Sequence, residues 1–456
     1  MTPTITKNTQ ASDPALTSYE HSPEAHWSLG TRLAFRFCCA YALIEWVTMC
    51  VWLLTSPLTL GLLRRPDSYG PLNMSLGKWL IGHILNLPEH SPPRLAANFL
   101  PLFLGIMAVA AICAVGAVVW SALDRGRTKA HPRLFVWLHT LMRFLLGAMM
   151  LLYGWGKVLP MQFAITLDRM AFEVAQHNPG DLLWAFMEGS RDYQLFTGFV
   201  EVAGGLLLLT RRTAMLGAII SMAAMANVLA LDISYDAPVK FLAGQIFLMS
   251  LFVLAPFAIR FFSVFDLTRN VHAAPPRRLF QSESVDRTAR AVGVVLGVWI
   301  AWTTLQESRN IIIARYNARQ GNAILGIWDV EAMTKNGTPV PLLITDATLW
   351  RRLVVPRNNS AVIVPMKQSA PQSQWTGRPN TVRCDIRLDS ASQTVQFTPF
   401  PFLGAIGPVD FAYALPDPDH LVLTSRNQNE TTVVVRLRRF DLSAYPLLSW
   451  ERHWNW

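Results

Sequence analysis

The chain has 456 residues, of which 52% are hydrophobic and only 15% are charged. Soluble globular proteins carry about 25% charged residues, so this composition excludes an ordinary soluble protein and indicates a membrane protein. The formal net charge of +10 does not indicate nucleic-acid binding, because the basic residues lie in short loops between apolar runs, where positive charge orients membrane helices.

The N-terminal region is predicted to form a tail followed by a transmembrane hairpin. Residues 1–28 are rich in Thr, Ser, Pro and charged residues and show no periodicity, which predicts a disordered tail. Residues 29–125 are expected to hold the hairpin, with membrane spans at 33–54 and 99–123.

Two features of this hairpin need an explanation. Residues 75–87 are amphipathic but too short to cross a bilayer, so we expect them to lie in the membrane interface. Glu45 falls near the middle of the first span, where an unpaired carboxylate is unfavourable. Either Glu45 has a partner within the bundle or the first span is misplaced.

Residues 134–265 are predicted to form a four-helix transmembrane bundle. Apolar runs long enough for a hydrocarbon layer about 30 Å thick occupy residues 134–159, 195–209, 214–231 and 241–259. A basic linker follows at 266–290, and a last transmembrane helix is expected at 291–315. About seven spans are therefore predicted.

The basic residues of the loops predict the orientation in the membrane. Most of them fall on one side, including Arg127, Arg211 and Arg278, whereas the other side of the central bundle carries Arg169, Arg191 and Lys240. The positive-inside rule then places the N-terminus in the cytoplasm and the C-terminal region on the outer side of the membrane. The loop after the first span argues the other way, because Arg64, Arg65, Lys78 and Arg94 would be external.

Residues 323–456 change to short alternating stretches separated by turn residues. Asn336-Gly337 is a typical hairpin turn, and at least seven short strands are expected. This pattern predicts a small all-β barrel or sandwich. Gly326-Ile327-Trp328, at the start of the first strand, resembles the start of lipocalin-like barrels.

The first helix of the central bundle carries small and ionisable residues at helical spacing. His139, Arg143, Gly147, Gly154 and Lys157 fall at steps that place them on one face. This face is predicted to turn inward, where Arg143 and Lys157 require partners. Glycines alone would indicate helix packing. We expect Arg143 to extend towards the cytoplasmic surface and His139 to be hydrogen-bonded in the core.

Polar side chains on the other three helices are expected at a common depth. Glu201, Asn227 and Gln245 each lie five or six residues from the outer end of a span, or about 7 to 9 Å below the surface at about 1.5 Å per residue. Lys157 can reach this layer from the outer end of its own helix. Because a buried carboxylate stays ionised beside an ammonium group, we predict a pair of Lys157 with Glu201. The external mouth above the layer is predicted to consist of Asp232, Tyr235, Asp236 and Lys240.

This layer has two interpretations. The first is structural, because polar side chains hydrogen-bond membrane helices together. The second is a small polar pocket, open to the outer face, that suits a quinone head group, an anion or a proton relay.

Several cofactor motifs are absent from the sequence. It contains no HExxH, paired-histidine haem spacing, cysteine cluster, GxSxG or phosphate-binding glycine loop. Four of the five cysteines lie in apolar segments, so no disulfide framework is expected. We therefore expect no metal and no covalently bound cofactor, and electron transfer would require a diffusible quinone or a partner protein.

Segments of the central bundle resemble the DoxX family of bacterial membrane proteins. The resemblance lies in residues 143–157, which end in Gly154-Trp155-Gly156-Lys157, and in residues 199–208, which read FVEVAGGLLL before Arg211-Arg212. Residues 183–188 (LWAFME) and 235–240 (YDAPVK) are similar to a long DoxX-like subgroup with an extra C-terminal domain.

The resemblance implies a four-helix membrane unit in which Lys157 and Glu201 match the recurrent Lys and Glu of the family. Its named members include the membrane subunit of thiosulfate:quinone oxidoreductase, while most others have no assigned activity. Asp232 stands where the subgroup often has Asn ahead of its Tyr-Asp pair, which adds a charge at the mouth.

The leading hypothesis is therefore a DoxX-type membrane component of a quinone-linked or other redox system, working with a redox partner subunit. The alternative is a non-catalytic membrane scaffold whose β domain binds a lipid, a small molecule or a partner protein. A third hypothesis is an ion or small-solute pathway through the bundle.

Overall fold

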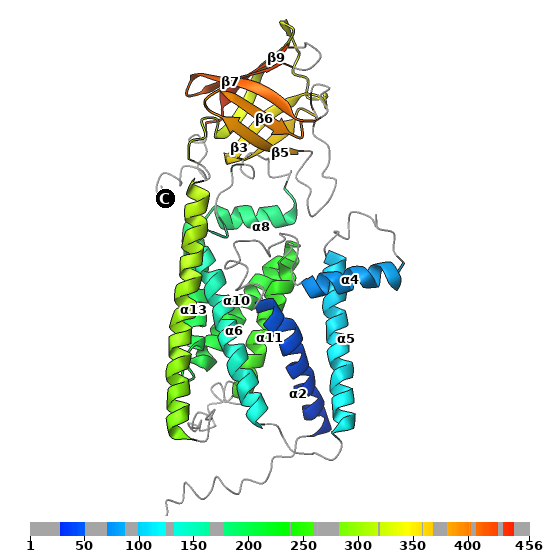
Figure 1. Ribbon diagram of the computed structural model, residues 1–456, viewed down its shortest axis with the longest axis vertical. Coiled ribbons are helices and arrows are strands. Elements are labelled where there is room, and N and C mark those ends of the chain that lie inside the picture. The colour runs from blue at the N-terminus through cyan, green and yellow to red at the C-terminus, as the bar shows by residue number, and fades with distance from the viewer. Residues whose placement is uncertain are drawn as a thin grey trace, which may run out of the picture.

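The computed structural model consists of a helical bundle with a β-barrel above one end of it (Figure 1). It describes residues 28–50, 71–86, 99–124, 132–159, 161–163, 167, 177–237, 239–258, 262, 282–317, 320–357, 359–367, 381–400, 402, 407–426 and 432–441. The predicted tail up to residue 27 and most of the predicted linker at 266–290 lie outside the described residues.

The helical elements follow the predicted order. They are α2 (Leu29–Tyr41), the π-helical η1 (Ala42–Val47), α4 (Pro71–His83), α5 (Phe99–Leu123), α6 (Pro132–Val158), α8 (Pro179–Glu188), α9 (Arg191–Leu208), α10 (Ala214–Ser234), α11 (Lys240–Leu254), the short 3₁₀ turn η3 (Ala255–Phe257) and α13 (Glu283–Asn317).

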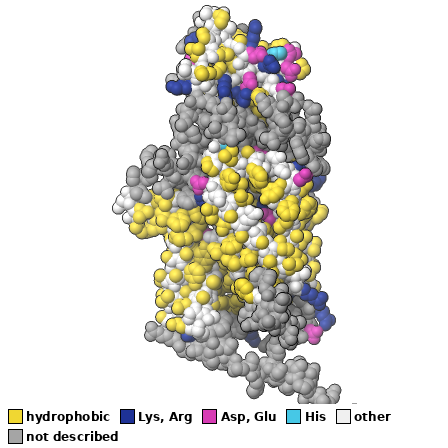
Figure 2. Space-filling model, turned by 180° about the vertical axis from the view of Figure 1, so that it is seen from behind, with side chains coloured by type: hydrophobic (Ala, Val, Ile, Leu, Met, Phe, Trp, Pro, Cys, Tyr) yellow, Lys and Arg dark blue, Asp and Glu magenta, His cyan; other side chains and the backbone are white. Residues whose placement is uncertain are grey.

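Six helices in the described part of the chain are long and apolar enough to cross a membrane, which indicates a membrane protein. They cover Leu29–Cys50, Leu100–Leu123, Arg133–Val158, Ala214–Ser234, Lys240–Phe257 and Glu283–Ala314. Hydrophobic side chains cover this half of the molecule, whereas charged side chains gather on the barrel and near the opposite end (Figure 2). The remaining predicted span, α9, lies among these helices but carries Arg191, Asp192 and Glu201 within 18 residues.

Glu45 is paired within the bundle, and the first span stands where it was predicted. Glu45 lies on η1 and is 2% exposed. Both of its carboxylate oxygens accept hydrogen bonds from Nδ2 of Asn73 on α4, at 2.8 and 3.0 Å. The partner is thus a neutral amide on the interfacial segment, which sequence periodicity does not identify.

Helix α4 lies across the barrel-side end of α5, as an interfacial helix would (Figure 1). The two backbones are in contact: a Cβ on Gly77 would lie 1.7 Å from the carbonyl oxygen of Pro101, and one on Gly105 would lie 1.9 Å from that of Asn73. Only glycine fits at these positions. The crossing holds Asn73 beside Glu45 and places Lys78 at the same end of the bundle as the barrel.

Glycines also bring α9 into backbone contact with α6. A Cβ on Gly198 would lie 3.0 Å from the carbonyl oxygen of Gly154, and a Cβ on Gly205 would lie 3.0 Å from that of Gly147. These pairs lie about two turns apart on antiparallel helices, so the helices touch along their length. Small residues allow such close approach between membrane helices.

Helix α13 differs from the predicted last span. It is a single helix of 35 residues that begins at Glu283, ahead of residue 291. At about 1.5 Å per residue it is about 52 Å long, more than a bilayer core requires. Residues 283–290, the end of the predicted linker, form its first turns. Its other end leads to the barrel (Figure 1).

The C-terminal region forms a closed antiparallel barrel and not a sandwich. The strands are β1 (Gly326–Lys335), β2 (Thr338–Pro339), β3 (Trp350–Arg357), β4 (Ser360–Pro365), β5 (Val382–Asp389), β6 (Thr394–Thr398), β7 (Val409–Asp417), β8 (His420–Arg426) and β9 (Thr432–Arg439). Eight strands close the barrel through pairing of β1 with β9, and β2 extends β1 as a short hairpin. The predicted turn at Asn336-Gly337 is confirmed, with φ of 49° and 79°.

Aromatic side chains fill the barrel. Trp328, Trp350, Phe397 and Phe411 are almost completely buried in one cluster. An eight-stranded barrel is just wide enough for such filling. Arg439 covers Trp328 with its guanidinium 4.3 Å from the ring centroid. These side chains occupy the space that a ligand of the kind carried by open barrels would need.

Gly154→Ala is expected to lower the unfolding temperature of the detergent-solubilised protein. The added Cβ would lie 2.7 Å from Cγ2 and 2.8 Å from the backbone nitrogen of Val202, and overpacking of this kind costs about 1–3 kcal/mol. Gly116→Ala on α5 is the matched control, because nothing lies within 4 Å of its Cβ position. Equal unfolding temperatures for the two variants would contradict the close packing of α6 and α9.

Candidate functional site

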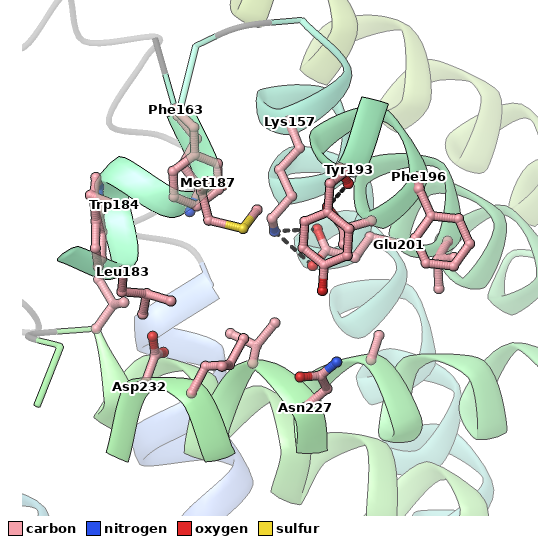
Figure 3. A pocket seen from close by; sticks show the side chains of 17 residues that line it. Lys157, Phe163, Leu183, Trp184, Met187, Tyr193, Phe196, Glu201, Asn227 and Asp232 are labelled. Carbon is pink, nitrogen blue, oxygen red and sulfur yellow. Dashed lines mark hydrogen bonds and ion pairs between the residues drawn. The ribbon is translucent and has the colours of Figure 1, made fainter. Parts of the chain in front are cut away.

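A cavity of about 180 Å³ lies between α6, α8, α9 and α10, at the barrel end of the bundle (Figure 3). Most of its lining is aromatic or aliphatic. The polar side chains that line it are Lys157, Gln162, Thr197, Glu201, Asn227 and Asp232. Four of the predicted site residues therefore meet in one cavity.

Lys157 and Glu201 form the predicted ion pair. Nζ of Lys157 lies 2.7 Å from each carboxylate oxygen of Glu201, and the two residues are only 5% and 1% exposed. Helical side chains point towards the N-terminus of their helix. Because α6 and α9 run in opposite directions, Lys157 points back into the bundle and Glu201 points outward to the same level. Each ion then compensates the desolvation of the other.

Arg191, at the start of α9, fixes the end of α6. Its Nη1 donates to the carbonyl oxygen of Lys157 at 3.0 Å, and its Nη2 donates to that of Val158. Carbonyl groups in the last turn of a helix lack intrahelical partners, so this contact satisfies them. Ser190 caps α9 by accepting a hydrogen bond from the backbone of Tyr193. These contacts determine where the Lys157 side chain begins.

Helix α8 lies between the bundle and the barrel (Figure 1), and its Leu183, Trp184 and Met187 line the cavity. It begins at Pro179 after Asn178, whose Oδ1 accepts a hydrogen bond from the Asp181 backbone at 2.8 Å. Leu183 and Met187 are its buried residues on the cavity side. Helix α8 is therefore a short amphipathic helix between the bundle and the barrel, and it forms the roof of the cavity on the barrel side.

The walls of the cavity are aromatic. Trp184 of α8 meets Phe163 edge-on, with ring centroids 5.8 Å apart. Tyr193 and Phe196, one turn apart on α9, stack with their centroids 6.4 Å apart. Aromatic rings therefore lie on two sides of the cavity, with the ion pair of Lys157 and Glu201 between them (Figure 3).

Helix α10 supplies the opposite polar side. Asp232 is 3% exposed, and its Oδ2 has no hydrogen-bond partner among the described residues. Asn227 lies on the same helix and is exposed on the surface of the bundle. Phe196, across the cavity on α9, is 64% exposed. Since both exposed residues also line the cavity, it opens sideways between α9 and α10, on the outer surface of the bundle.

Gln245 does not reach this cavity. Its Oε1 accepts from Nε1 of Trp46, and its Nε2 donates to the hydroxyl oxygen of Tyr41, both at 2.8 Å. It joins α11 to the first span instead. The prediction that Gln245 shares a cavity with Glu201 is wrong, because equal depth does not fix the direction of a side chain around the helix axis.

Asp236 and Lys240 form an ion pair with each other at the connection between α10 and α11. Neither belongs to the described lining of the cavity. Of the predicted mouth, only Asp232 lines it. Tyr235 does not line it either, and Asp236 and Lys240 neutralise each other locally.

The remaining members of the α6 stripe lie away from the cavity. His139 is hydrogen-bonded in the core as predicted, through Nε2 and the carbonyl oxygen of Val253 at 2.9 Å. Arg143 is 5% exposed, so it does not extend to the surface as predicted. Its guanidinium lies over the ring of Phe144 at 4.9 Å.

Residues of α8 and of the first turns of α9 are missing from the sequence prediction. Trp184, Met187, Tyr193 and Phe196 contribute much of the lining. The signal available was the Asn178-Pro179 helix start, together with aromatic residues one turn apart at Tyr193 and Phe196. In the sequence, Arg191 counts only as one of the basic loop residues that predict the orientation, and its contact with the end of α6 is not predicted.

The described residues contain no group of three or more His, Cys, Asp or Glu that could hold a metal ion. Burial raises the pKa of Cys384 in the barrel to about 12, so it is a thiol near neutral pH. The chemistry that the cavity itself offers is an ammonium donor, a carboxyl group and an amide beside flat apolar walls.

Comparison with curated proteins finds similarity to the uncharacterized protein YwoB of Bacillus subtilis (strain 168). The two are 32% identical over 123 residues, which cover 27% of this chain and 79% of YwoB. No protein-family model matches the chain, and no solved structure matches it.

Lys157→Met is expected to destabilise the protein by about 3–5 kcal/mol, because it leaves the Glu201 carboxylate buried without a cation. The double variant Lys157→Met/Glu201→Met removes both charges, and its stability should lie closer to that of the wild type. Thermal unfolding in detergent measures all the variants. A double variant that loses the sum of the two single losses would show that the pair is not coupled.

Proposed function

The chain belongs to the same family as YwoB of Bacillus subtilis, and since that relative is itself uncharacterized, we propose a function from the cavity. In this proposal, the cavity beside Lys157 and Glu201 binds the head group of a quinone dissolved in the bilayer. The protein then acts as the membrane component of a quinone-linked redox system, of the DoxX type that its sequence resembles.

The cavity is large enough to hold one six-membered ring. A cavity of about 150 Å³ in a protein core accommodates benzene, and this cavity measures about 180 Å³. A benzoquinone ring with its two carbonyl groups is of this size. The stacked faces of Tyr193 and Phe196 suit a flat ligand.

The polar groups match the two ends of a quinone. An ammonium group has three N–H donors, and Lys157 uses two of them on Glu201. The third can bind a quinone oxygen and stabilise the negative charge that develops on it as electrons arrive. Asp232, across the cavity, offers a carboxyl oxygen that is not hydrogen-bonded to the described protein.

The reaction is the reduction of a quinone to a quinol, or its reverse. Two electrons and two protons are added to the quinone oxygens, and Asp232 is the group placed to exchange one of these protons. We assign the electrons to a redox partner protein, which delivers them at the membrane surface.

The sideways opening is the observation that carries the proposal. A water-soluble substrate would reach the site from the aqueous end, where α8 forms the roof of the cavity. A quinone carries an apolar tail and diffuses within the bilayer. An opening between α9 and α10, with Phe196 and Asn227 at its rim, lets the head group enter while the tail stays in lipid.

The positive-inside rule supports the orientation proposed for this site. Arg211 and Arg212 lie between α9 and α10, at the end of the bundle opposite the cavity. We place this end in the cytoplasm, and the cavity and the barrel on the extracytoplasmic side.

The barrel offers a second candidate function, as a platform for a partner protein and not as a lipid carrier. Its interior is filled by aromatic side chains. On its outer surface, Ile327 and Val354 form a buried cluster against which Leu167, from the segment between α6 and α8, packs. A protein bound to the barrel would therefore act close to the roof of the cavity.

Binding of a short-tailed ubiquinone analogue to the purified protein in lipid nanodiscs tests the proposal. Phe196→Ala removes an aromatic face from the cavity and is expected to weaken binding about tenfold, the equivalent of about 1.4 kcal/mol. Phe199→Ala is the matched control: Phe199 is also exposed on α9, at 54%, and does not line the described cavity. It should bind as the wild type does.

Asn227→Leu tests the polar rim by the same measurement, and it should weaken binding without disturbing the ion pair. Absence of binding to the wild type would refute a quinone site. Equal binding by the wild type and the variants at Phe196 and Asn227 would place the quinone elsewhere on the protein.

A further inference from the structure

Arg143 is a buried cation for which the described residues provide no hydrogen-bond acceptor. It is 5% exposed, its Nε has no hydrogen-bond partner, and its guanidinium contacts the ring of Phe144. A guanidinium group carries five N–H donors and remains charged at physiological pH. Burying it without an acceptor is strongly unfavourable.

Arg36 differs from Arg143 in the same bundle, because its two Nη atoms have protein partners although its Nε, like that of Arg143, has none among the described residues. It is 1% exposed, and it donates through Nη1 to Ser121 at 2.7 Å and through Nη2 to Asp124 at 2.5 Å. Lys157, at the other end of α6, likewise has Glu201. Arg143 is the member of the α6 stripe for which the described protein provides no counter-charge.

The surroundings of Arg143 are positive. Arg211, on the connection between α9 and α10, acts on it as a like charge. Arg211 forms an ion pair with Asp286 of α13, at 3.5 Å. Arg212, next in the chain, is exposed. Among the described residues, Arg143 therefore has a like charge as a neighbour and no carboxylate paired with it.

The start of α10 adds to this field. Thr213, which precedes α10, donates its hydroxyl to the carbonyl oxygen of Leu207 and makes no capping hydrogen bond to the helix. The N-terminus of α10, with its partial positive charge, therefore lies on the same connection as Arg211. An anion could reach the two guanidinium groups from the surface at Arg211, because the side chain of Arg211 is 19% exposed.

We propose that Arg143 and Arg211 form a binding site for a phosphate group, at the end of the bundle opposite the barrel. Two guanidinium groups hold a phosphate through paired charge-assisted hydrogen bonds. The phosphate is either that of an anionic phospholipid head group or a free inorganic ion. Its binding supplies the acceptors that Arg143 lacks, so it stabilises the fold independently of any ligand in the cavity beside Lys157.

The test compares Arg143→Met with Arg36→Met, which removes an equally buried arginine that has protein partners. Unfolding temperatures are measured in nanodiscs of phosphatidylcholine alone, in nanodiscs that also contain phosphatidylglycerol, and in phosphatidylcholine with inorganic phosphate added. Native mass spectrometry measures the retained phosphatidylglycerol directly.

The wild type is expected to be stabilised by phosphatidylglycerol, by phosphate or by both. Arg143→Met should lose this stabilisation and retain phosphatidylglycerol at least about tenfold less, as expected for the loss of charged hydrogen bonds. Arg36→Met should be less stable in every lipid but keep the response. Arg211→Gln should weaken the response as well.

A response to phosphatidylglycerol alone identifies a lipid head group, and a response to inorganic phosphate identifies a free anion. A wild type that responds to neither overturns the site. An undiminished response in Arg143→Met also overturns it. Neither result depends on quinone binding, because Arg143 does not line the cavity described above.

Discussion

The structure depends on one ion pair buried where water is scarce. The ammonium group of Lys157 and the carboxylate of Glu201 are stable in such surroundings only while they touch. A shift of α6 against α9 by one turn, about 5.4 Å, would separate them and leave two uncompensated charges. The pair therefore fixes the register of the two helices, and the glycine contacts that bring their backbones together let it form. Arg191 ties the same two helix ends through backbone carbonyl groups, which adds a second constraint at that level.

Helix α6 carries two buried cations, Arg143 and Lys157, and only Lys157 is paired with a carboxylate among the described residues. Lys157 has an internal counter-ion and lines a cavity whose walls are mostly apolar. Arg143 is as deeply buried, but its neighbours include Arg211 and no carboxylate of its own. The first arrangement suits a neutral, polarisable ligand from the bilayer, because no net charge remains to be balanced. The second leaves positive charge in excess, which suits an anion. Both follow from the same rule, that a charge removed from water requires a partner.

The cavity and the barrel are also connected. Helix α8 closes the aqueous end of the cavity, and the segment that precedes it contributes Leu167 to the outer surface of the barrel. Helix α13 carries the barrel to this end of the bundle as one continuous element (Figure 1). An interaction on the barrel therefore lies next to the roof of the cavity, whereas the sideways opening lies between α9 and α10, away from it. Under the proposed function, a soluble partner would contact the barrel above this roof, whereas a lipid-soluble ligand would enter the cavity between α9 and α10.

The sequence by itself determined the long apolar helices, the all-β character of the C-terminal region and the common depth of Lys157 and Glu201, because these properties depend on local periodicity and on counting from a helix end. For Lys157 and Glu201 that was sufficient, since few other charges are available at their depth. The sequence did not determine helix α8, the start of α13 or the burial of Arg143. Tertiary structure decided the rest. Gln245 has the right depth but turns towards Tyr41 and Trp46, and the aromatic walls come from α8 and α9, which are distant in sequence from Lys157. Closure of the barrel likewise depends on β1 meeting β9. The direction of a side chain around a helix axis, and the partner of an edge strand, are set by which elements pack against each other, and no local pattern encodes that choice.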